Sequence, residues 1–466
     1  MNRLTVVDEI FLRTHRGMGT PIALQGLWRT DDAMEPTLLQ AIHDRLRAGA
    51  LGRRVVRARV PGARRAWRPN TQAHPLDHVG SPLPEAAILP WADTLGTDLD
   101  PEFGPGWRLS SASLEDGGTV VALTCSHALA DARGLIHAVA AALDELAEGT
   151  DHPTNGLTTD SAATPPPTAL ATCDVSTPPQ PEPTAATAST LPPRLTMRQV
   201  RTDSRPNTDT HEKRWGTSTS DWADARVQWS TIIGGTARAL RRGIPRPPAT
   251  GTPDPSHDRA LHSTLLTFDA AEWDDTAAAS GGTPNSLFIH LVANILWETG
   301  FQNSEIAASL PVNTRDEPRV DNDLAMTEIA MDRSDTPATI RDKARTAYLR
   351  RMSSPADLPE EILQVLPDRW AYALSKGAGE RDILCSNIGT LPEALRTVGA
   401  HHCDRVAARA IHPGLTEFPR TQLSGYLSKL AETYTLALVS LSCDRETLNA
   451  ATDRACTAAG LHAAPW

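Results

Sequence analysis

Between residues 117 and 146, the order of apolar and polar positions predicts a buried strand that leads into a helix. Gly117-Gly118 is a turn signal, and residues 119–124 form an apolar, β-branched run that is typical of a buried strand. After a polar break, an alanine-rich helix is predicted from about Asp131 to Leu146. His127 is therefore expected where the strand ends.

The first 150 residues show similar strand and helix patterns around this stretch. Strands are predicted at 21–28, 53–60 and 107–114, and a helix with one apolar stripe at about 35–48. Glu115-Asp116-Gly117-Gly118 predicts a hairpin that joins residues 107–114 to 119–124. We therefore predict an N-terminal lobe over residues 1–150.

The composition changes after Gly149. Residues 151–194 are rich in Thr, Ala and Pro and cannot bury enough apolar surface to offset the entropy of ordering. We predict a disordered linker without catalytic residues there, and a helical connecting segment over 195–260 with a helix at about 220–242. Trp215, Trp222 and Trp229 recur every seven residues, which indicates a packing stripe or, alternatively, an amphipathic lid over an acyl channel.

A second globular pattern spans residues 261–466. Strands are predicted at 262–268, 306–315, 324–331, 382–389 and 433–441, and helices at about 270–280, 284–299, 336–352, 360–377 and 445–461. Thr283 is placed to cap the second of these helices, with Pro284 at its first position. These elements predict a C-terminal lobe.

Composition and charge narrow the classes of function. The chain has 466 residues and a net charge of −11, which favours two domains and argues against general nucleic-acid binding. It has no run of about 18 apolar residues, so no membrane span is expected. Asp8 and Glu9 follow the first residues closely, so no secretory signal is expected and the protein is predicted to be cytoplasmic. Six scattered cysteines without a C-x-x-C pair indicate reduced thiols rather than a zinc site.

His127 is the candidate catalytic residue. The unperturbed pKa of histidine lies near neutrality, so a histidine can take up a proton at physiological pH. A rigid position at the end of a strand makes His127 suitable as a general base. Asp131, four residues on, is placed to hold the loop by pairing with an arginine elsewhere. The spacing alone is a weak signal, because about one such match is expected by chance among 15 histidines. The strand before it and the helix after it supply the context.

The stretch Ser126-His127-Ala128-Leu129-Ala130-Asp131 resembles the motif of the condensation-domain and HxxxD acyltransferase superfamily, which is usually His-His-x-x-x-Asp-Gly. That superfamily includes wax-ester synthases, polyketide-associated acyltransferases and free-standing condensation enzymes. The chain departs from the motif twice, since Ser126 replaces the first histidine and Ala132-Arg133 precede Gly134. The resemblance implies an α/β fold of two chloramphenicol-acetyltransferase-like lobes in a V, with His127 in a central tunnel.

The same resemblance implies partners for the motif loop. In Pro311-Val312-Asn313-Thr314-Arg315, Arg315 falls where the superfamily's arginine pairs with the motif aspartate. A bridge from Arg315 to Asp131 would lock the histidine loop in one geometry; a surface turn is the alternative for Arg315. Ser126 and Gly134 are expected to shape the loop.

Ser386-Asn387-Ile388-Gly389 resembles the strand end that lies near the tunnel in alcohol-acyltransferase-like members. Ser386 or Asn387 is placed to donate a hydrogen bond to the substrate or to an oxyanion. A simple turn formed by Asn-x-Gly is the alternative.

The implied reaction is acyl transfer, in which His127 deprotonates a hydroxyl or amine that attacks a thioester and forms an ester or amide. We expect no metal and no tightly bound cofactor, with acyl-coenzyme A or a phosphopantetheinyl carrier protein as co-substrate. A small-molecule acceptor, a monomeric state and a role in bacterial specialised or lipid metabolism are also expected. A non-catalytic scaffold that binds a carrier protein or partner enzyme stays open, because Arg133 is long enough to occupy the acceptor's place. Cyclisation, dehydration or epimerisation of a tethered intermediate is a third possibility.

Two further clusters leave alternatives open. Residues 44–68 contain nine arginines and one acid. These arginines could bind the phosphates of coenzyme A or an acidic carrier protein. The alternative is a solvated edge strand whose charges prevent aggregation. His401-His402-Cys403-Asp404 suggests a metal site, but the spacing and neighbours favour an ordinary surface or turn role.

Overall fold

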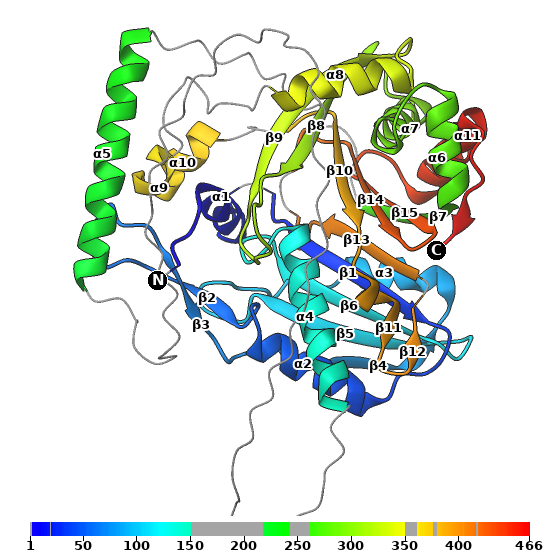
Figure 1. Cartoon of the computed structure of the whole chain (residues 1–466), viewed down its shortest axis with the longest axis horizontal. Helices are drawn as coiled ribbons and strands as arrows, with labels where there is room; N and C mark the ends of the chain where they lie inside the picture. Colours follow the sequence, from blue (N-terminus) through cyan, green and yellow to red (C-terminus); the bar gives the residue numbers. More distant parts are fainter. Residues whose placement is uncertain are drawn as a thin grey trace, which may run out of the picture. The chain divides into compact units, whose positions relative to one another are not determined.

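The computed structural model describes residues 2–18, 20–150, 218–242, 261–349, 361–375, 380–403, 405–415 and 418–466, which belong to one compact unit. The fold is mixed α/β, as predicted (Figure 1). The predicted linker at 151–194 and both ends of the segment at 195–260 lie outside the described residues.

The N-terminal sheet has five strands in the order β13-β1-β6-β5-β4. The strands are β1 (Ala23–Thr30), β4 (Asp77–Leu83), β5 (Trp107–Leu114), β6 (Thr119–Ser126) and β13 (Arg405–Ile411). The predicted hairpin is confirmed, because β5 and β6 pair antiparallel with Ser113 opposite Thr119. All residues of β6 are buried, since it lies between β1 and β5.

Strand β13 comes from the C-terminal half of the chain. It pairs antiparallel with β1, with Ala23 opposite Ile411 and Arg29 opposite Arg405. The sequence pattern did not predict this exchange. The N-terminal sheet is therefore completed by residues that follow the predicted lobe boundary by more than a hundred positions.

The C-terminal sheet has seven strands in the order β16-β7-β15-β14-β10-β8-β9. The strands are β7 (His262–Asp269), β8 (Glu305–Asn313), β9 (Leu324–Asp332), β10 (Ile383–Thr390), β14 (Leu423–Leu430), β15 (Thr433–Ser440) and β16 (Ala464–Pro465). Strand β10 is parallel to both neighbours, β8 and β14, whereas the other pairs are antiparallel.

Two small ribbons accompany the sheets. One pairs β2 (Arg53–Val56) with β3 (Ala66–Pro69), and the other pairs β11 (Thr397–Val398) with β12 (His401–His402) after the 3-10 turn η3 (Glu393–Arg396). The strand predicted at 53–60 therefore ends at Val56. The chain then turns back through Pro61-Gly62, where Gly62 adopts a positive φ of 86°.

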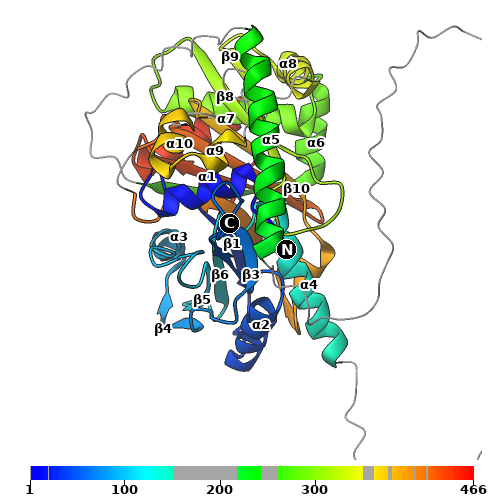
Figure 2. The ribbon, with the colours of Figure 1, turned by 90° about the vertical axis from the view of Figure 1, so that its left-hand side faces the viewer.

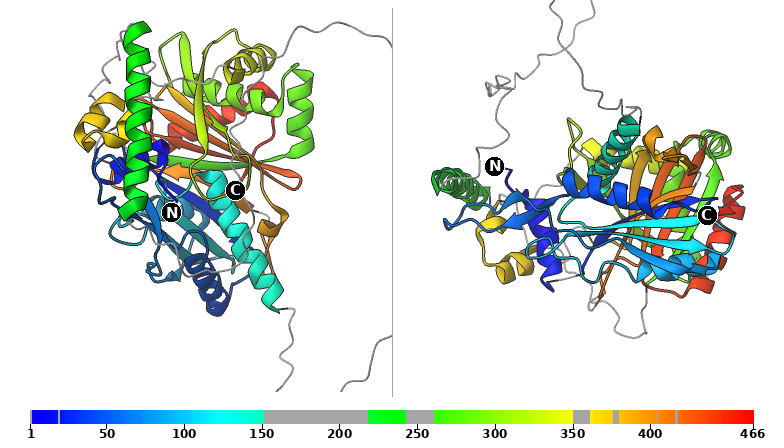
Figure 3. Two further views of the ribbon diagram at one scale, coloured as in Figure 1. Left: turned by 60° about the vertical axis from the view of Figure 1, so that its left-hand side comes forward. Right: turned by 90° about the horizontal axis from the view of Figure 1, so that it is seen from below.

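Each sheet is covered by its own set of helices. The helices are α1 (Val6–His15), α2 (Pro36–Ala48), α3 (Ile88–Asp93), α4 (Ala132–Thr150), α5 (Ser218–Arg242), α6 (Ala270–Ala279), α7 (Pro284–Glu298), α8 (Pro337–Leu349), α9 (Ile362–Val365), α10 (Asp368–Ser375) and α11 (Arg445–Ala459), with a 3-10 turn η1 (Glu85–Ala87). Helices α2 and α4 pack on the five-stranded sheet, and α6, α7 and α11 pack on the seven-stranded sheet (Figures 1 and 3). None of the helices in these ranges has the length and apolar character needed to cross a bilayer.

Helix α5 confirms the helix predicted at 220–242 but not its packing stripe. Trp222 is 67% exposed and Trp229 is 44% exposed; Trp215 lies outside the described residues. The buried side of the helix instead carries Asp221, Ala225, Gln228 and Ile232. Asp221 pairs with Arg3, and Asp224 pairs with Arg64. Figure 2 shows α5 running beside the region of α1, α9 and α10.

One hydrophobic core contains buried residues of both sheets. Leu27 and Leu123 from the N-terminal sheet belong to the same buried cluster as Tyr426 and Val439 from the C-terminal sheet. A second cluster lies between the outer face of the C-terminal sheet and its helices, with Phe288 of α7 at 0% exposure. The loops at the ends of β6 and β8 meet beside the shared core.

Candidate active site

The loop that carries His127 is fixed by its backbone. The N–H of Ser126 donates to Gly106 O at 2.8 Å, and the N–H of His127 donates to Ile22 O at 3.2 Å. The N–H of Leu129 closes a turn onto Ser126 O at 2.9 Å. Residues 128–131 are buried, so the loop has few alternative conformations.

Asp131 ends the loop and caps α4. Its Oδ1 accepts from the N–H of Gly134 at 2.8 Å, which satisfies one of the free amides at the start of the helix. Gly134 itself permits a close approach, because a Cβ there would lie 2.4 Å from the backbone oxygen of Val320. Gly134 thus shapes the site through the contact between α4 and the loop after β8.

The predicted partner of Asp131 is in contact with it. Arg315 Nη2 donates to Asp131 Oδ1 at 2.6 Å, and both side chains are 7% exposed. Asp131 Oδ2 accepts from the N–H of Asp323 at 3.0 Å. Arg315 also donates to Asp321 O at 2.5 Å, so one guanidinium organises its own loop and holds the His127 loop.

Asn322 is the polar neighbour of His127 that sequence reasoning missed. Its Nδ2 donates to Asp8 Oδ1 at 2.7 Å and to His127 O at 2.9 Å. These oxygens accept from the amide, so they orient its Oδ1 toward His127 Nδ1, 3.2 Å away. Nδ1 therefore carries the proton, and Nε2 is left as the basic nitrogen.

Phe11 of α1 covers one face of the His127 ring. The two ring centroids are 3.6 Å apart and the planes differ by 13°. Burial lowers the pKa of His127 below its ordinary value of 6.5, despite opposing contributions from nearby backbone groups and Asp131. The imidazole is therefore neutral at pH 7.

Asp8 supports Asn322 from α1. It forms a capping box with Thr5, in which the N–H of Thr5 donates to Asp8 Oδ2 at 2.8 Å and the N–H of Asp8 donates to Thr5 Oγ1 at 3.1 Å. Burial raises the pKa of Asp8 to about 6, against the hydrogen bonds from Thr5 and Asn322. The Thr-x-x-Asp pattern was a signal for the start of α1, but nothing in it pointed to His127.

Ser386 and Asn387 point to different sides of the C-terminal sheet. Leu384, two residues before Ser386 on the same face of β10, packs in the core shared with the N-terminal sheet, whereas Cys385 packs on the helix side. Ser386 Oγ makes no hydrogen bond within the described part of the chain. Asn387 is occupied, since its Nδ2 donates to Asn285 Oδ1 and its Oδ1 accepts from the N–H of Gly389, both at 2.9 Å. Of the two, Ser386 is the available donor.

Arg133 reaches the same strand end from α4. Its Nη1 donates to Thr390 O at 3.0 Å, and a Cβ at Gly389 would lie 2.4 Å from its Nη2. Burial and the nearby Arg315 lower its pKa, while Asp131 opposes this shift. The altered turn of the motif therefore places a cation against β10.

Six of the nine clustered arginines form ion pairs with described residues, namely Arg45, Arg47, Arg53, Arg57, Arg64 and Arg65. Arg53 illustrates their effect: it donates to Asp321 at 2.5 Å and to Leu129 O, and its guanidinium lies over Trp67. Much of the cluster therefore joins segments of this chain. Phosphate or carrier binding by the exposed Arg54, Arg57 and Arg59 stays a prediction.

The His401 region pairs with carboxylates. His401 Nδ1 lies 2.9 Å from Asp32 Oδ1, and its Nε2 lies 2.8 Å from Glu35 Oε2. No group of three or more metal-ligating side chains with the geometry of a metal site occurs among the described residues.

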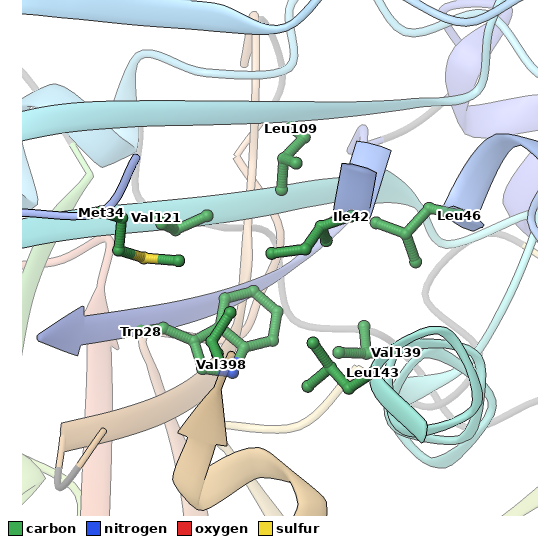
Figure 4. Close-up of a pocket in the computed structure, with 9 residues that line it drawn as sticks. All are labelled: Trp28, Met34, Ile42, Leu46, Leu109, Val121, Val139, Leu143 and Val398. Atoms are coloured by element: carbon green, nitrogen blue, oxygen red, sulfur yellow. The ribbon is translucent and has the colours of Figure 1, made fainter. Parts of the chain in front are cut away.

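A small cavity lies within the N-terminal lobe and not at His127. Figure 4 shows apolar side chains around it, including Ile42 and Leu46 from α2 and Val139 and Leu143 from α4. Its volume of about 20 Å³ is of the size of one water molecule. It is a packing defect of the core and cannot hold an acyl chain.

Together, the two lobes and the His127 loop define a fold of the condensation-domain class. No protein-family model matches the sequence, and no curated protein matches it. Among solved structures, the first condensation domain of the CDA synthetase is 12% identical with a TM-score of 0.55, over 98% of this chain and 94% of that one. Polyketide synthase associated protein 5 from Mycobacterium tuberculosis is 14% identical with a TM-score of 0.53, over 98% of both chains.

A larger relative shows the same fold within a longer chain. The nonribosomal peptide synthetase FmoA3, with alpha-methyl-L-serine-AMP bound, is 14% identical with a TM-score of 0.53. The match covers 98% of this chain but only 44% of that synthetase. The TM-scores and coverage of these matches support the fold alone.

Proposed function

We propose that the protein is an acyltransferase or free-standing condensation enzyme in which His127 is the general base. The supporting observation is the state of that ring: Nδ1 faces Asn322, one face is stacked on Phe11, and burial keeps the imidazole neutral. Such a ring presents one basic nitrogen in a fixed direction. The Asp131–Arg315 pair holds its loop from the other lobe.

In the proposed reaction, His127 Nε2 takes the proton of an acceptor hydroxyl or amine as its oxygen or nitrogen bonds to a thioester carbonyl carbon. The resulting oxyanion needs a hydrogen-bond donor, and Ser386 Oγ is the candidate. Collapse of the tetrahedral intermediate breaks the C–S bond. The proton on His127 then passes to the departing sulfur, which gives a free thiol and an ester or amide.

The donor we propose is a pantetheine thioester, carried by coenzyme A or by a carrier protein, and the acceptor is a small molecule. No tightly bound cofactor enters this scheme. We further propose a monomeric cytoplasmic enzyme of bacterial specialised or lipid metabolism. Carrier-protein use is supported by the likeness to a condensation domain and to a polyketide-synthase-associated protein.

The test is thiol release from a panel of acyl-coenzyme A and acyl-carrier-protein donors with pooled hydroxyl and amine acceptors. We expect acceptor-dependent release by the wild type and none by His127→Ala. His137→Ala is the matched control, because His137 is exposed on α4 beyond the motif and is expected to keep full activity. Equal release by the wild type and His127→Ala would contradict the proposal.

A non-catalytic scaffold is the second candidate, and the contact of Arg133 with Thr390 O favours it, because a cation spans the region beside the motif. This candidate predicts binding of a carrier protein without thiol release. It also predicts that Arg133→Ala alters binding or access rather than chemistry. Stereochemical analysis of recovered carrier-bound substrates distinguishes both candidates from epimerisation.

A further inference from the structure

A second histidine lies beside the motif loop, although it is distant in sequence. His15 is the last residue of α1, and its Nε2 is 2.6 Å from Ser126 Oγ. Ser126 is fully buried and directly precedes His127. The sequence shows Ser126 in place of a histidine, and the smaller side chain leaves room for the ring of His15.

The direction of this hydrogen bond follows from the partners of Ser126. Its Oγ accepts from the N–H of Ala128 at 3.2 Å, so its own proton is free to be donated to His15 Nε2. Burial lowers the pKa of His15 to about 4, with Asp100 opposing and His127 reinforcing the shift. His15 is therefore neutral at pH 7 and accepts through Nε2.

Helix α1 supports the loop at two points. Phe11 and His15 are four residues apart and hence lie on one face of the helix. Phe11 stacks on His127, while His15 holds the hydroxyl that closes the turn from Ser126 to Ala128. His127 is the middle residue of that turn.

We propose that His15 is a positioning residue that acts through Ser126 to fix the orientation of His127. This inference rests on the proposed function only in assigning His127 its chemistry. Helix α1 carries no recognised motif, but in this proposal its residues help to orient His127.

The test is a double-mutant cycle with His15→Leu and Ser126→Ala. Because both changes remove the same hydrogen bond, the double variant is expected to resemble the single variants rather than to multiply their losses. We expect kcat to fall about ten- to a hundredfold with little change in KM, since small misplacements of catalytic groups have effects of this size. His15→Gln retains an acceptor for Ser126 and is expected to recover most of the activity.

A spectroscopic readout separates this proposal from the proposed function. Chains labelled with 15N-histidine report the tautomer and pKa of His127 directly, whether or not acyl transfer is detected. We expect the His127 signals to shift in His15→Leu and in Ser126→Ala and to return in His15→Gln. His43→Leu is the control, because it removes a buried histidine whose Nε2 contacts His74 O on another part of the lobe; it should lower stability without moving these signals. Unchanged His127 signals in His15→Leu, or losses that multiply in the cycle, would overturn the inference.

Discussion

The Asp131 carboxylate has three partners from two distant parts of the chain. Gly134, Arg315 and Asp323 all donate to it, and the side chain is only 7% exposed. A buried charge that loses its counter-charge keeps the cost of desolvation without the compensating attraction. Removal of either partner of this buried pair is therefore expected to destabilise the protein more than removal of one partner of an ion pair on the surface.

Arg315→Met tests this dependence. We expect the free energy of unfolding in urea to fall by about 3–5 kcal/mol and the proposed acyl transfer to be lost. Arg454→Met is the control, because the pair of Arg454 with Glu298 is about half exposed and such pairs contribute about 0–1 kcal/mol. A loss in Arg315→Met no larger than in the control would show that the bridge does not hold the loop.

The motif pattern identified His127, Asp131 and Arg315, and the structure brings the last two into contact. It did not identify Asn322 or Phe11, which make the direct contacts with the His127 ring. These contacts depend on side-chain directions after folding, and Asn322 is 195 residues away from His127. Neither residue belongs to a local pattern that carries chemistry, so their roles could not be read from spacing.

At the scale of elements, the end of β10 is fitted to the start of α4. Gly389 has a φ of 79°, a conformation that side chains with a Cβ adopt at a cost. The space beside it is filled by the Arg133 guanidinium, which donates to Thr390 O. Backbone strain and steric exclusion therefore act at the same residue.

Gly389→Ala separates these two effects. The left-handed conformation alone costs about 1–2 kcal/mol, as expected for the control Gly460→Ala, where φ is 71° and the Cβ meets nothing within 4 Å. We expect a larger fall in melting temperature for Gly389→Ala, and Arg133→Ala in the same chain should restore the excess. Equal falls in both alanine variants would mean that Arg133 moves aside freely.

The β11–β12 ribbon is held to the N-terminal lobe by a titratable contact. Burial opposes the charge of His401, but its contacts with Asp32 and Glu35 outweigh burial, so its pKa is raised above the ordinary 6.5. The folded state therefore binds the proton more tightly than the unfolded state. This stabilisation is fully present below pH 6.5 and is lost as the pH rises through the higher pKa of the folded state.

Accordingly, the wild type should lose stability between pH 6 and pH 8.5 through this contact, and His401→Gln should lose less over the same interval. Urea unfolding at both pH values measures the difference. Asp32 and Glu35 are more than 60% exposed, so high salt should weaken the effect. An identical pH dependence in both proteins would exclude His401 as its source.

At the scale of the whole molecule, the two sheets depend on each other. The N-terminal sheet takes β13 from the C-terminal half, and one buried cluster contains residues of both sheets. The sequence predicted many strands and helices of each half, including a strand after residues 401–404, but it missed β3, β4 and β14 and the helices α1 and α3. Gly425 shows why in the case of β14: glycine disfavours a strand, yet a Cβ there would lie 2.6 Å from Val292 Cγ2. Tight packing against α7, which no local pattern reveals, selects the residue.

This dependence predicts a single cooperative unfolding transition for both sheets. In native-state hydrogen exchange with increasing denaturant, the amides of β6 and β15 should converge on the same opening free energy and the same denaturant dependence. Because β6 and β15 belong to different sheets, separate values would show that the halves unfold independently.

The pairing of β13 with β1 also sets an order of events during synthesis. The ribosome completes β1 at residue 30 and begins β13 only at residue 405, which corresponds to a delay of roughly 20–75 s at about 5–20 residues per second. Throughout that interval the edge of β1 that later pairs with β13 has unpaired amide donors and carbonyl acceptors. Such an edge is a template for pairing with other chains. The nascent protein thus carries an unpaired strand edge long after its first domain-sized segment has emerged, and we expect a chaperone that covers this edge until β13 has been translated to reduce aggregation.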